Sequence, residues 1–420
     1  MPKIIFINRF FYPDHSATSQ MLSDITFGLA EKGWQVTVIT SRLFYQGSGG
    51  PPLPSRETTR NVEILRTWSS SFGRDRLVGR AIDYATFYLS TAVAVMRTSR
   101  RGDILVAKTD PPMLSILIAP LAWLRGAKLV NWLQDVFPEV AQAIGVGGVP
   151  PFVYPLLRRV RDRSLKRSYA NVVLGDRMRS RLIDMGVATE RIRVIANFAD
   201  GAKVKPIETQ DNLLRQSWGL REKFVVGYSG NFGRAHEHQT LTSAMELLSS
   251  PAGREEEGHS RIAWLFVGSG ALHGELERAV VSRQIANVHF KPYQPDELLA
   301  ASLSAPDVHL VSLRPELEGL IVPSKFYGIA AAGRPTIFIG DPDGEIARVI
   351  AQHGCGYTVK VGDGVALAQT IRELAADPQR CRQMGERARF AFAAEFDTSI
   401  AIGRWEELLG EVGGARSRPV

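Results

Sequence analysis

The chain has 420 residues, of which 45% are hydrophobic and 22% charged, the composition of a globular protein large enough for two domains. Its two cysteines, Cys355 and Cys381, have no motif spacing, which excludes a disulfide framework and a zinc cluster and fits a reducing cytosol. Residues 1–200 carry 27 Lys and Arg against 16 Asp and Glu, a net charge of +11, whereas residues 201–420 carry 24 against 27, a net charge of −3.

The positive charge of the first half predicts an anionic partner. Its basic residues are not interleaved with aromatic ones and no nucleic-acid motif occurs, so we expect no nucleic acid and favour an anionic membrane surface. The longest apolar stretches, residues 85–96 and 113–124, are shorter than the roughly 20 residues of a membrane-spanning helix. The start reads as a buried strand rather than a signal peptide, because Asn8 and Arg9 interrupt its apolar run. We expect a cytoplasmic protein, peripheral at the inner face of the cell membrane.

Short β-rich runs alternate with helical patterns through the first half. The expected strands, in chain order, are Lys3–Ile7, Gln35–Thr40, Val62–Thr67, Asp103–Lys108, Lys128–Leu133, Val172–Leu174 and Arg193–Ala196. The helical patterns include Ser16–Lys32, Arg80–Thr98 and Met113–Arg125, and Gly47–Pro54 reads as a flexible loop. This alternation predicts a parallel, doubly wound sheet.

The alternation restarts beyond a switch near residues 200–213. The expected strands are Phe224–Tyr228, Ala263–Val267, Val288–Lys291, Val308–Ser312 and Thr336–Ile339, with helices between them. We therefore predict an α/β protein of two Rossmann-like, doubly wound domains that face a central cleft, residues 1–200 and 201–395. Residues 396–420 are expected to form a helix around Trp405 that packs back toward the N-terminal domain, followed by a frayed tail.

Ligands of doubly wound sheets bind beyond the carboxyl ends of the strands, so the chemistry is expected in the loops that follow them. The first loop, YPDHSATSQ, gathers four candidate polar side chains: Asp14, His15, Ser16 and Thr18. The alternative for this loop is plain helix capping by Ser16. In LVNWLQDVFPE, Asp135 follows a strand and is a candidate general base or orienting acid, with capping of the next turn as the alternative.

A basic amphipathic stretch, LLRRVRDRSLKRSYA, lies between the last strands of the first half. Six cations stand within ten residues: Arg158, Arg159, Arg161, Arg163, Lys166 and Arg167. We weigh docking on anionic lipid headgroups against an ordinary solvated face, and the charge asymmetry favours lipid.

Two glycine loops of the second half are candidate anion sites. In FVVGYSGNFGRAHEH, the residues Gly230, Asn231, Gly233 and Arg234 precede a helix, where backbone N–H groups and a guanidinium suit a phosphate. The spacing is not G-x-G-x-x-G, so we expect no dinucleotide cofactor. Gly268 follows the next strand, and helix packing is its simpler explanation. Beyond the third strand, Lys291 and Tyr293 are expected beside a base.

The densest stretch is EGLIVPSKFYGIAAAGRP, residues 318–335. Pro323 and Ser324 suit the first turn of a helix, with Ser324 as its cap, whereas a lysine there is unfavourable with the helix dipole. Lys325 is therefore expected to face an anion, and a solvated lysine is the alternative. No metal-ligand spacing occurs among the eight histidines, and His236 and His238 are too close to a helix start to indicate a site.

Taken together, GYSGNFGRAHE, VHFKPYQPDELL, GLIVPSKFYGIAAAGRP, WLQDVFPE and VIANFAD resemble GT-B glycosyltransferases of family 4. They are most similar to the branch with bacterial colanic-acid, O-antigen and capsule transferases. The resemblance implies a retaining, metal-independent hexosyltransferase without a cofactor, which takes a nucleotide-diphosphate sugar in the second domain and a lipid-linked, polyprenyl-diphosphate glycan in the first. It implies a diphosphate held by Gly230, Gly233, Arg234 and Lys325, with Gly319 and Ser324 nearby. It also implies that Asp135, with His15, serves the acceptor hydroxyl, and that Asp14, Ser16 and Thr18 line its site.

The sequence departs from the family at one acid. The family carries two glutamates with seven residues between them, and these positions are Leu320 and Gly328 here. The second acid, which often holds the donor ribose, is therefore absent. Glu318 replaces the first glutamate only if the loop differs by two residues. Two alternatives stay open: a GT-B epimerase of nucleotide sugars, and a non-catalytic nucleotide-sugar-binding protein.

Overall fold

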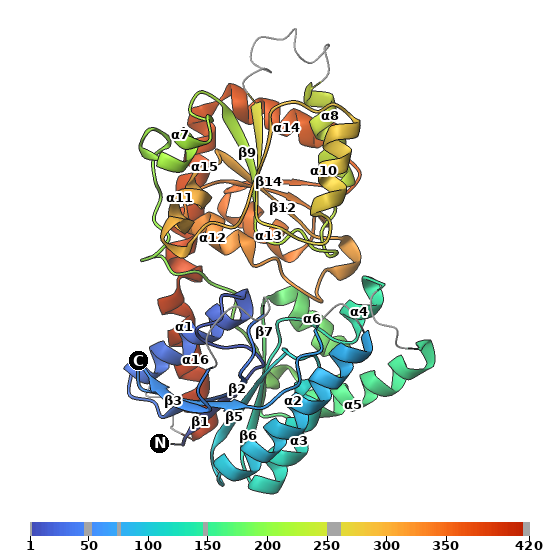
Figure 1. Cartoon of the computed structure of the whole chain (residues 1–420), viewed down its shortest axis with the longest axis vertical. Coiled ribbons are helices and arrows are strands. Elements are labelled where there is room, and N and C mark those ends of the chain that lie inside the picture. Colours follow the sequence, from blue (N-terminus) through green and yellow to red (C-terminus); the bar gives the residue numbers. More distant parts are fainter. Residues whose placement is uncertain (1, 46–52, 74–76, 146–149, 250–261, 415–420) are drawn as a thin grey trace. The chain divides into compact units, whose positions relative to one another are not determined.

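The computed structural model describes residues 2–45, 53–73, 77–145, 150–249 and 262–414 (Figure 1). The chain forms two compact units. Unit 1 comprises residues 1–196, 319–321 and 398–420, and unit 2 comprises residues 197–318 and 322–397. Most of the predicted Gly47–Pro54 loop and the tail beyond residue 414 lie outside the described residues.

Unit 1 is built on an eight-stranded sheet with the order β3-β4-β2-β1-β5-β6-β7-β8. Every strand pair is parallel except β3 with β4. The strands are β1 (Ile4–Ile7), β2 (Val36–Ser41), β3 (Arg56–Thr59), β4 (Val62–Thr67), β5 (Ile104–Lys108), β6 (Lys128–Trp132), β7 (Ala170–Val173) and β8 (Ile192–Val194). The central strands are buried on both faces, which explains their continuous runs of β-branched and other apolar residues.

Helices cover both faces of this sheet (Figure 1). They are α1 (Ala17–Glu31), α2 (Leu77–Thr98), α3 (Leu114–Arg125), α4 (Glu139–Ala143), α5 (Tyr154–Arg167), α6 (Asp176–Asp184) and α16 (Thr398–Gly413). On one face, Trp405 of α16 is fully buried, with its ring centroid 4.8 Å from that of Trp132. Gly28 lets α16 approach α1, because a Cβ there would lie 2.2 Å from the side chain of Ile402. The C-terminal helix is therefore part of the unit 1 core.

Unit 2 is built on a six-stranded, all-parallel sheet with the order β11-β10-β9-β12-β13-β14. Its strands are β9 (Phe224–Ser229), β10 (Ile262–Val267), β11 (Val288–Lys291), β12 (Val308–Ser312), β13 (Thr336–Ile339) and β14 (Gly356–Val359). Its helices are α7 (Leu213–Ser217), α8 (Gln239–Ser249), α10 (His273–Ser282), α11 (Leu299–Ser304), α12 (Lys325–Ala331), α13 (Glu345–His353), α14 (Gly364–Ala376) and α15 (Pro378–Ala391). The doubly wound prediction is confirmed for both units.

Two strands were not predicted, β3 and β14. β3 pairs antiparallel with β4 through a tight turn at Arg60 and Asn61, which have φ values of +47° and +62°. Left-handed positions of this kind are usually signalled by Asn-Gly or Asp-Gly, and the Arg-Asn pair carries no such signal. The remaining strands differ from their predicted ranges by no more than two residues at either end.

Candidate functional site

Each sheet has one topological switch point, where the strand order reverses direction. In unit 1 it lies between β1 and β5, and in unit 2 between β9 and β12. The loops beyond these strand ends diverge to opposite sides of the sheet and leave room for a ligand. The predicted site residues fall largely in loops at the carboxyl ends of the two sheets, so each unit has a candidate site of its own.

In unit 2, the glycines after β9 and β10 allow two loops to lie against each other. A Cβ at Gly268 would lie 2.5 Å from the carbonyl oxygen of Gly230, and one at Gly270 would lie 2.5 Å from that of Phe232. The backbone nitrogen of Gly230 donates to Val267 O at 2.8 Å, and that of Gly268 to Lys291 O at 2.9 Å. The N–H of Gly230 is therefore used in pairing the ends of β9 and β10, so any backbone N–H groups offered to an anion come from other residues of the loop. The close approach at Gly268 fits the packing role named as its alternative.

Lys325 lies against this glycine loop. A Cβ at Gly230, whose φ is +110°, would lie 3.1 Å from Cε of Lys325, so a larger residue there would displace the lysine. The Lys325 Nζ is 2.9 Å from Nε2 of His236 and 5.3 Å from the centroid of the Tyr228 ring. Burial lowers the pKa of Lys325 to about 8. The ammonium is thus held at the switch point by a neutral side chain and an aromatic face, with no carboxylate among these contacts.

Two further cations stand at the same loops. Arg234 is exposed, as is Asn231. Arg314 follows β12, donates its backbone N–H to Ala235 O at 3.0 Å, and pairs its guanidinium with Glu316. Cations in neighbouring loops beside a helix start suit a ligand with several negative charges.

The other predicted donor residues are dispersed. Lys291 directs its Nζ to the Trp218 ring, 5.8 Å from the centroid, and Tyr293 is 47% exposed. Gly319 has a left-handed φ of +74° and is grouped with unit 1. Ser324 stands at the N-cap position of α12, but its hydroxyl makes no capping bond, so that detail was wrong. Its own backbone is already helical, whereas a side-chain cap requires an extended residue.

In the stretch 318–335, where Gly328 stands at the place of the second family glutamate, the carboxylate that is present belongs to Glu318. Its Oε1 accepts a hydrogen bond from the backbone nitrogen of Glu345 at 2.8 Å, at the start of α13. Gly328 lies on α12, where a Cβ would contact only Leu303, at 3.3 Å. Glu318 therefore has a structural partner in addition to any ligand it contacts.

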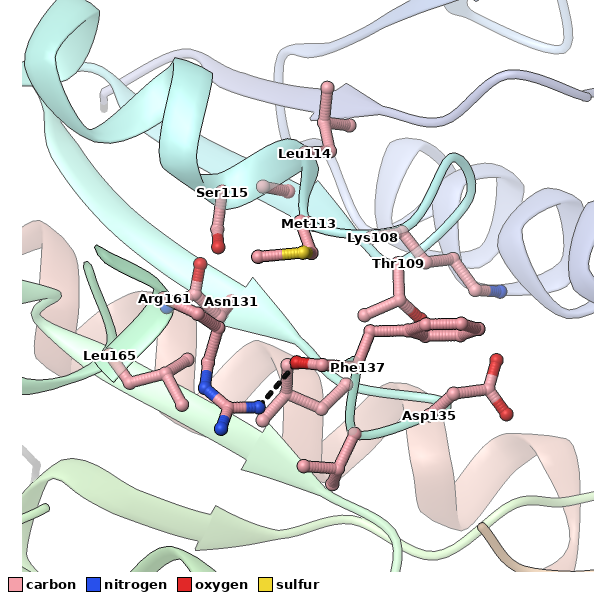
Figure 2. Close-up of a pocket in the computed structure, with 13 residues that line it drawn as sticks. Lys108, Thr109, Met113, Leu114, Ser115, Asn131, Asp135, Phe137, Arg161 and Leu165 are labelled. Carbon is pink, nitrogen blue, oxygen red and sulfur yellow. Dashed lines mark hydrogen bonds between the residues drawn. The ribbon is translucent and has the colours of Figure 1, made fainter. Parts of the chain in front are cut away.

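In unit 1, Lys108 and Asp135 lie at the edge of a small, mostly apolar cavity of about 20 Å³, the size of roughly one water molecule (Figure 2). Lys108 is 1% exposed, donates from Nζ to the carbonyl oxygen of Thr18 at 2.7 Å, and lies 4.1 Å from the centroid of the Trp132 ring. In Figure 2 the side chains of Lys108 and Asp135 extend to the same side of the cavity, opposite Arg161. The fold therefore brings the first turn of α1 and the carboxyl ends of β5 and β6 together around one buried lysine.

Electrostatics couple the charged groups of this site. Burial and the nearby Asp110 raise the pKa of Asp135 to about 6, while Lys108 opposes that shift. Burial lowers the pKa of Lys108 to about 7, against the attraction of Asp110 and Asp135. A carboxyl group with a pKa near the working pH is suited to accepting a proton or a hydrogen bond from a bound hydroxyl.

The loop after β1 is fixed by Asp14. Its carboxylate accepts hydrogen bonds from the backbone nitrogen of Ser16 at 2.8 Å, from the Ser16 hydroxyl, and from the backbone nitrogen of Tyr45. Ser16 stands at the N-cap position of α1, but its hydroxyl is directed to Asp14 and makes no capping bond, so the alternative of side-chain capping by Ser16 is wrong. His15 is exposed, and Thr18 contributes its carbonyl oxygen to Lys108.

The loop that carries Asp135 is anchored by a buried ion pair. Arg161 of α5 holds both carboxylate oxygens of Glu139, at 2.7 and 3.0 Å, and is 4% exposed. Burial lowers the pKa of Arg161, but its bonds to Glu139 and Asp162 outweigh this and hold it above its usual value. Arg158 also pairs with Glu139, at 3.3 Å. The predicted basic face is thus smaller than expected, because Arg161 points inward and only four of its cations are exposed: Arg159, Arg163, Lys166 and Arg167.

Sequence reasoning missed Lys108, His236 and Arg314. Lys108 ends an apolar strand, ILVAK, and a lysine at the carboxyl end of a buried strand was the available signal. His236 was considered only as a metal ligand. Within the described ranges, no three His, Cys, Asp or Glu side chains gather as a metal site, and no helix combines the length and hydropathy needed to cross a bilayer.

Two family models match the chain. The glycosyl transferase 4-like domain matches residues 18–197, and the glycosyl transferases group 1 domain matches residues 210–390. A probable glycosyltransferase of Pseudomonas aeruginosa, WbjE, is 28% identical over 72% of this chain and 73% of its own length.

Solved structures share the fold. HepE of Anabaena in complex with UDP-glucose has a TM-score of 0.71 at 16% identity, covering 98% of this chain and all of its own. WaaG, a glycosyltransferase involved in lipopolysaccharide biosynthesis, has a TM-score of 0.68 at 15% identity, and the match covers 98% of this chain and the whole of WaaG. The two units together are therefore a GT-B glycosyltransferase fold. The chain belongs to family 4 of the glycosyltransferases, as the motifs predicted.

Proposed function

We propose that this glycosyltransferase retains anomeric configuration and moves a hexose from a nucleotide-diphosphate donor to a lipid-linked glycan in bacterial surface polysaccharide synthesis. The observation that carries the donor half is the Lys325 ammonium, held at the unit 2 switch point beside the glycine loop. Arg234 and Arg314 add charge at the same loops. The UDP-glucose complex of HepE, which shares the fold, supports a sugar nucleotide as the donor class.

The leaving diphosphate gains negative charge as the glycosidic bond breaks. Fixed cations stabilise such charge where it develops, without a metal ion. We assign this role to Lys325 and Arg234, with Arg314 as a third cation. The proposed reaction therefore needs no metal cofactor.

Unit 1 is the proposed acceptor domain. Asp135 accepts a hydrogen bond, and then the proton, from the acceptor hydroxyl. Its raised pKa of about 6 leaves the carboxylate largely ionised but still basic at neutral pH. The segment with Asp14, His15, Ser16 and Thr18, which runs into the first turn of α1, is tied to the same strand ends through the bond from Lys108 to Thr18. We assign this loop to acceptor binding.

An anionic membrane surface is the proposed location of the acceptor, and the outer helices of unit 1 support it. Helices α2, α3 and α5 pack side by side. They and their flanking segments expose large apolar side chains: Trp68, Phe72, Val78, Leu89, Trp123, Leu124, Phe152 and Leu156, each at least 60% exposed. Exposed cations accompany them on α5. Apolar side chains bordered by arginines suit an anionic bilayer interface.

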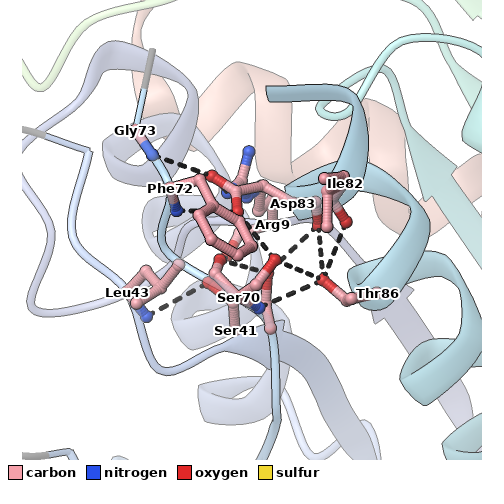
Figure 3. Close-up of polar contacts among 10 residues, drawn as sticks. Arg9, Ser41, Leu43, Ser70, Phe72, Gly73, Ile82, Asp83 and Thr86 are labelled. Atoms are coloured by element: carbon pink, nitrogen blue, oxygen red, sulfur yellow. Dashed lines mark hydrogen bonds and ion pairs between the residues drawn. The ribbon is translucent and has the colours of Figure 1, made fainter. Parts of the chain in front are cut away.

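The backbone of one of these aromatic residues, Phe72, is held by a hydrogen-bond network around the buried Asp83 (Figure 3). The carboxylate of Asp83 accepts bonds from the backbone nitrogens of Phe72 and Gly73, at 2.9 and 3.2 Å, and from the Ser70 hydroxyl at 2.7 Å. Burial would raise the pKa of Asp83, but these donors and Arg9, 3.7 Å away, hold it below its usual value. The backbone of Phe72 is thus fixed while its ring remains 66% exposed.

The test is direct transfer. Purified protein is incubated with UDP-, GDP- and ADP-sugars and a polyprenyl-diphosphate-linked acceptor, and products are analysed by mass spectrometry. We expect one donor to be consumed, an α-linked product from an α-linked donor, and no loss of rate in a chelator. Absence of transfer together with absence of nucleotide binding in calorimetry would refute the proposal. Isomerised donor formed without acceptor would identify an epimerase.

A further inference from the structure

We infer that His236 is the positioning residue of the donor site: its neutral imidazole, oriented by the Ser312 carbonyl, fixes the Lys325 ammonium over the glycine loop. The inference rests on the proposed function, because the ligand of that ammonium is the donor diphosphate. It concerns this chain's own contacts: His236 follows the candidate phosphate residue Arg234 by two positions, and no role in donor binding was predicted for it.

Two hydrogen bonds define the state of the imidazole. Nδ1 of His236 is 2.6 Å from the carbonyl oxygen of Ser312, and Nε2 is 2.9 Å from Nζ of Lys325. A carbonyl oxygen only accepts, so Nδ1 carries the hydrogen. Nε2 is then an acceptor and takes a hydrogen bond from the lysine ammonium. Burial and the Lys325 charge lower the pKa of His236 to about 3, so the ring stays neutral at ordinary pH.

The ring is held by packing as well as by its hydrogen bonds. Phe232 stacks on it with a centroid distance of 6.0 Å and an interplanar angle of 11°, and Tyr228 meets it edge-on at 5.8 Å. Both aromatic residues are buried members of the unit 2 core. The imidazole therefore has one defined orientation, with Nε2 directed at the lysine.

This arrangement spans the switch point of unit 2. His236 lies in the loop after β9, Ser312 is the last residue of β12, and Lys325 is the first residue of α12. The hydrogen bonds thus tie the loop after β9 to the strand and helix on the other side of the reversal.

The geometry also leaves the ammonium free for a ligand. An ammonium has three donors, of which one is directed to His236, so two remain for phosphate oxygens. A long, flexible lysine side chain binds more tightly when it is ordered before the ligand arrives. The imidazole supplies this order without a negative charge, which would otherwise repel the diphosphate.

The test is a double-mutant cycle in which nucleotide affinity is measured by calorimetry. The ligands are the diphosphates UDP and GDP, and the monophosphates UMP and GMP, which lack the second phosphate group, serve as controls. Lys325→Met should weaken binding of the preferred diphosphate about tenfold or more, the value of a hydrogen bond to a charged group. His236→Met, which keeps bulk but lacks the acceptor, should weaken it about tenfold. His236→Gln, whose amide oxygen accepts from the lysine, should recover most of the affinity. The monophosphate should bind all variants similarly.

The decisive variant carries both changes, Lys325→Met and His236→Met. If His236 acts only through the lysine, the double variant binds no more weakly than Lys325→Met alone. If His236→Met weakens diphosphate binding as much in the Lys325→Met background as in the wild type, His236 has only a structural role and the inference is overturned. Unchanged diphosphate affinity in Lys325→Met would instead remove the donor site from the proposed function, which is a separate outcome.

A second measurement needs no destabilised variant. In nitrogen NMR spectra of histidine-labelled wild-type protein, the His236 signals are assigned by their absence in His236→Gln. We expect the neutral ring with hydrogen on Nδ1 from pH 5 to 8. Hydrogen on Nε2, or a protonated ring in this range, would contradict the inference.

Discussion

The carboxylate of Glu318 accepts a hydrogen bond from the backbone nitrogen of Glu345, 2.8 Å away, at the first residue of α13. A helix start has free N–H groups and a positive dipole end, and a carboxylate there satisfies both. Glu318 thus stabilises unit 2 even though the motif suggested it for the donor ribose.

We predict that Glu318→Ala lowers the free energy of unfolding by about 1 kcal/mol, the value of a lost cap, and that Glu318→Gln lowers it less because the amide oxygen still accepts. Urea unfolding followed by circular dichroism measures both. Nucleotide affinity of Glu318→Gln should stay within twofold of wild type. A tenfold loss there, at unchanged stability, would assign Glu318 to the ribose instead.

The sequence predicted the doubly wound units because alternating strand and helix patterns depend on local periodicity, which tertiary context rarely overrides in buried parallel strands. Lys325 could be predicted as a site residue because a lysine at a helix start is locally unfavourable. The roles of His236 and Lys108 could not, since they arise from partners 76 and 90 residues away in the chain, Ser312 and Thr18. The inward direction of Arg161 was missed for the same reason: nothing in the helix itself indicates that Glu139 faces it.

The Arg161–Glu139 pair should be a stability determinant of unit 1. Removing Arg161 leaves the buried Glu139 carboxylate with Arg158 as its remaining ion-pair partner, and breaking such a buried pair costs up to about 3–5 kcal/mol. We predict that Arg161→Met lowers the free energy of unfolding by that amount. Replacement of both residues, Arg161→Met with Glu139→Gln, should recover much of the loss. The matched control is Arg163→Met on the exposed face of the same helix, which should change stability by less than about 0.5 kcal/mol. Equal effects of Arg161→Met and Arg163→Met would show that the buried pair contributes nothing.

The acid limb of the pH profile should report Asp135. If the ionised carboxylate serves the acceptor hydroxyl, kcat/KM falls as the pH drops through about 6, the raised pKa of Asp135. Lys108 lowers that pKa and Asp110 raises it, so the limb should move to higher pH in Lys108→Met and to lower pH in Asp110→Asn. Lys205→Met, an exposed lysine of unit 2, should leave it unchanged. Shifts in the same direction for both unit 1 variants would exclude Asp135 as the titrating group.

Membrane association should depend on the exposed aromatic side chains of unit 1. Trp123 and Phe152 are each 80% exposed, so serine at both positions removes apolar area without disturbing the core. We predict that this double variant loses about tenfold in affinity for vesicles containing phosphatidylglycerol, measured by co-sedimentation. Phe390→Ser, at a 76% exposed site of unit 2, is the matched control and should bind like wild type. Equal losses in the two variants would indicate a general effect of apolar surface.

Nucleotide-diphosphate affinity should fall at high pH because of Lys325. Burial lowers the pKa of Lys325 in the free protein to about 8, and a diphosphate prefers the charged form. Below pH 8 the lysine is protonated and binding is at its full strength; above it, each further pH unit should cost about tenfold in affinity, until the bound-state pKa is reached. Calorimetry between pH 7 and 9 measures this slope, in a range where the nucleotide phosphates no longer titrate. Lys325→Arg keeps a permanent charge and should give a flat profile. A slope that persists in Lys325→Arg would place the titrating group elsewhere.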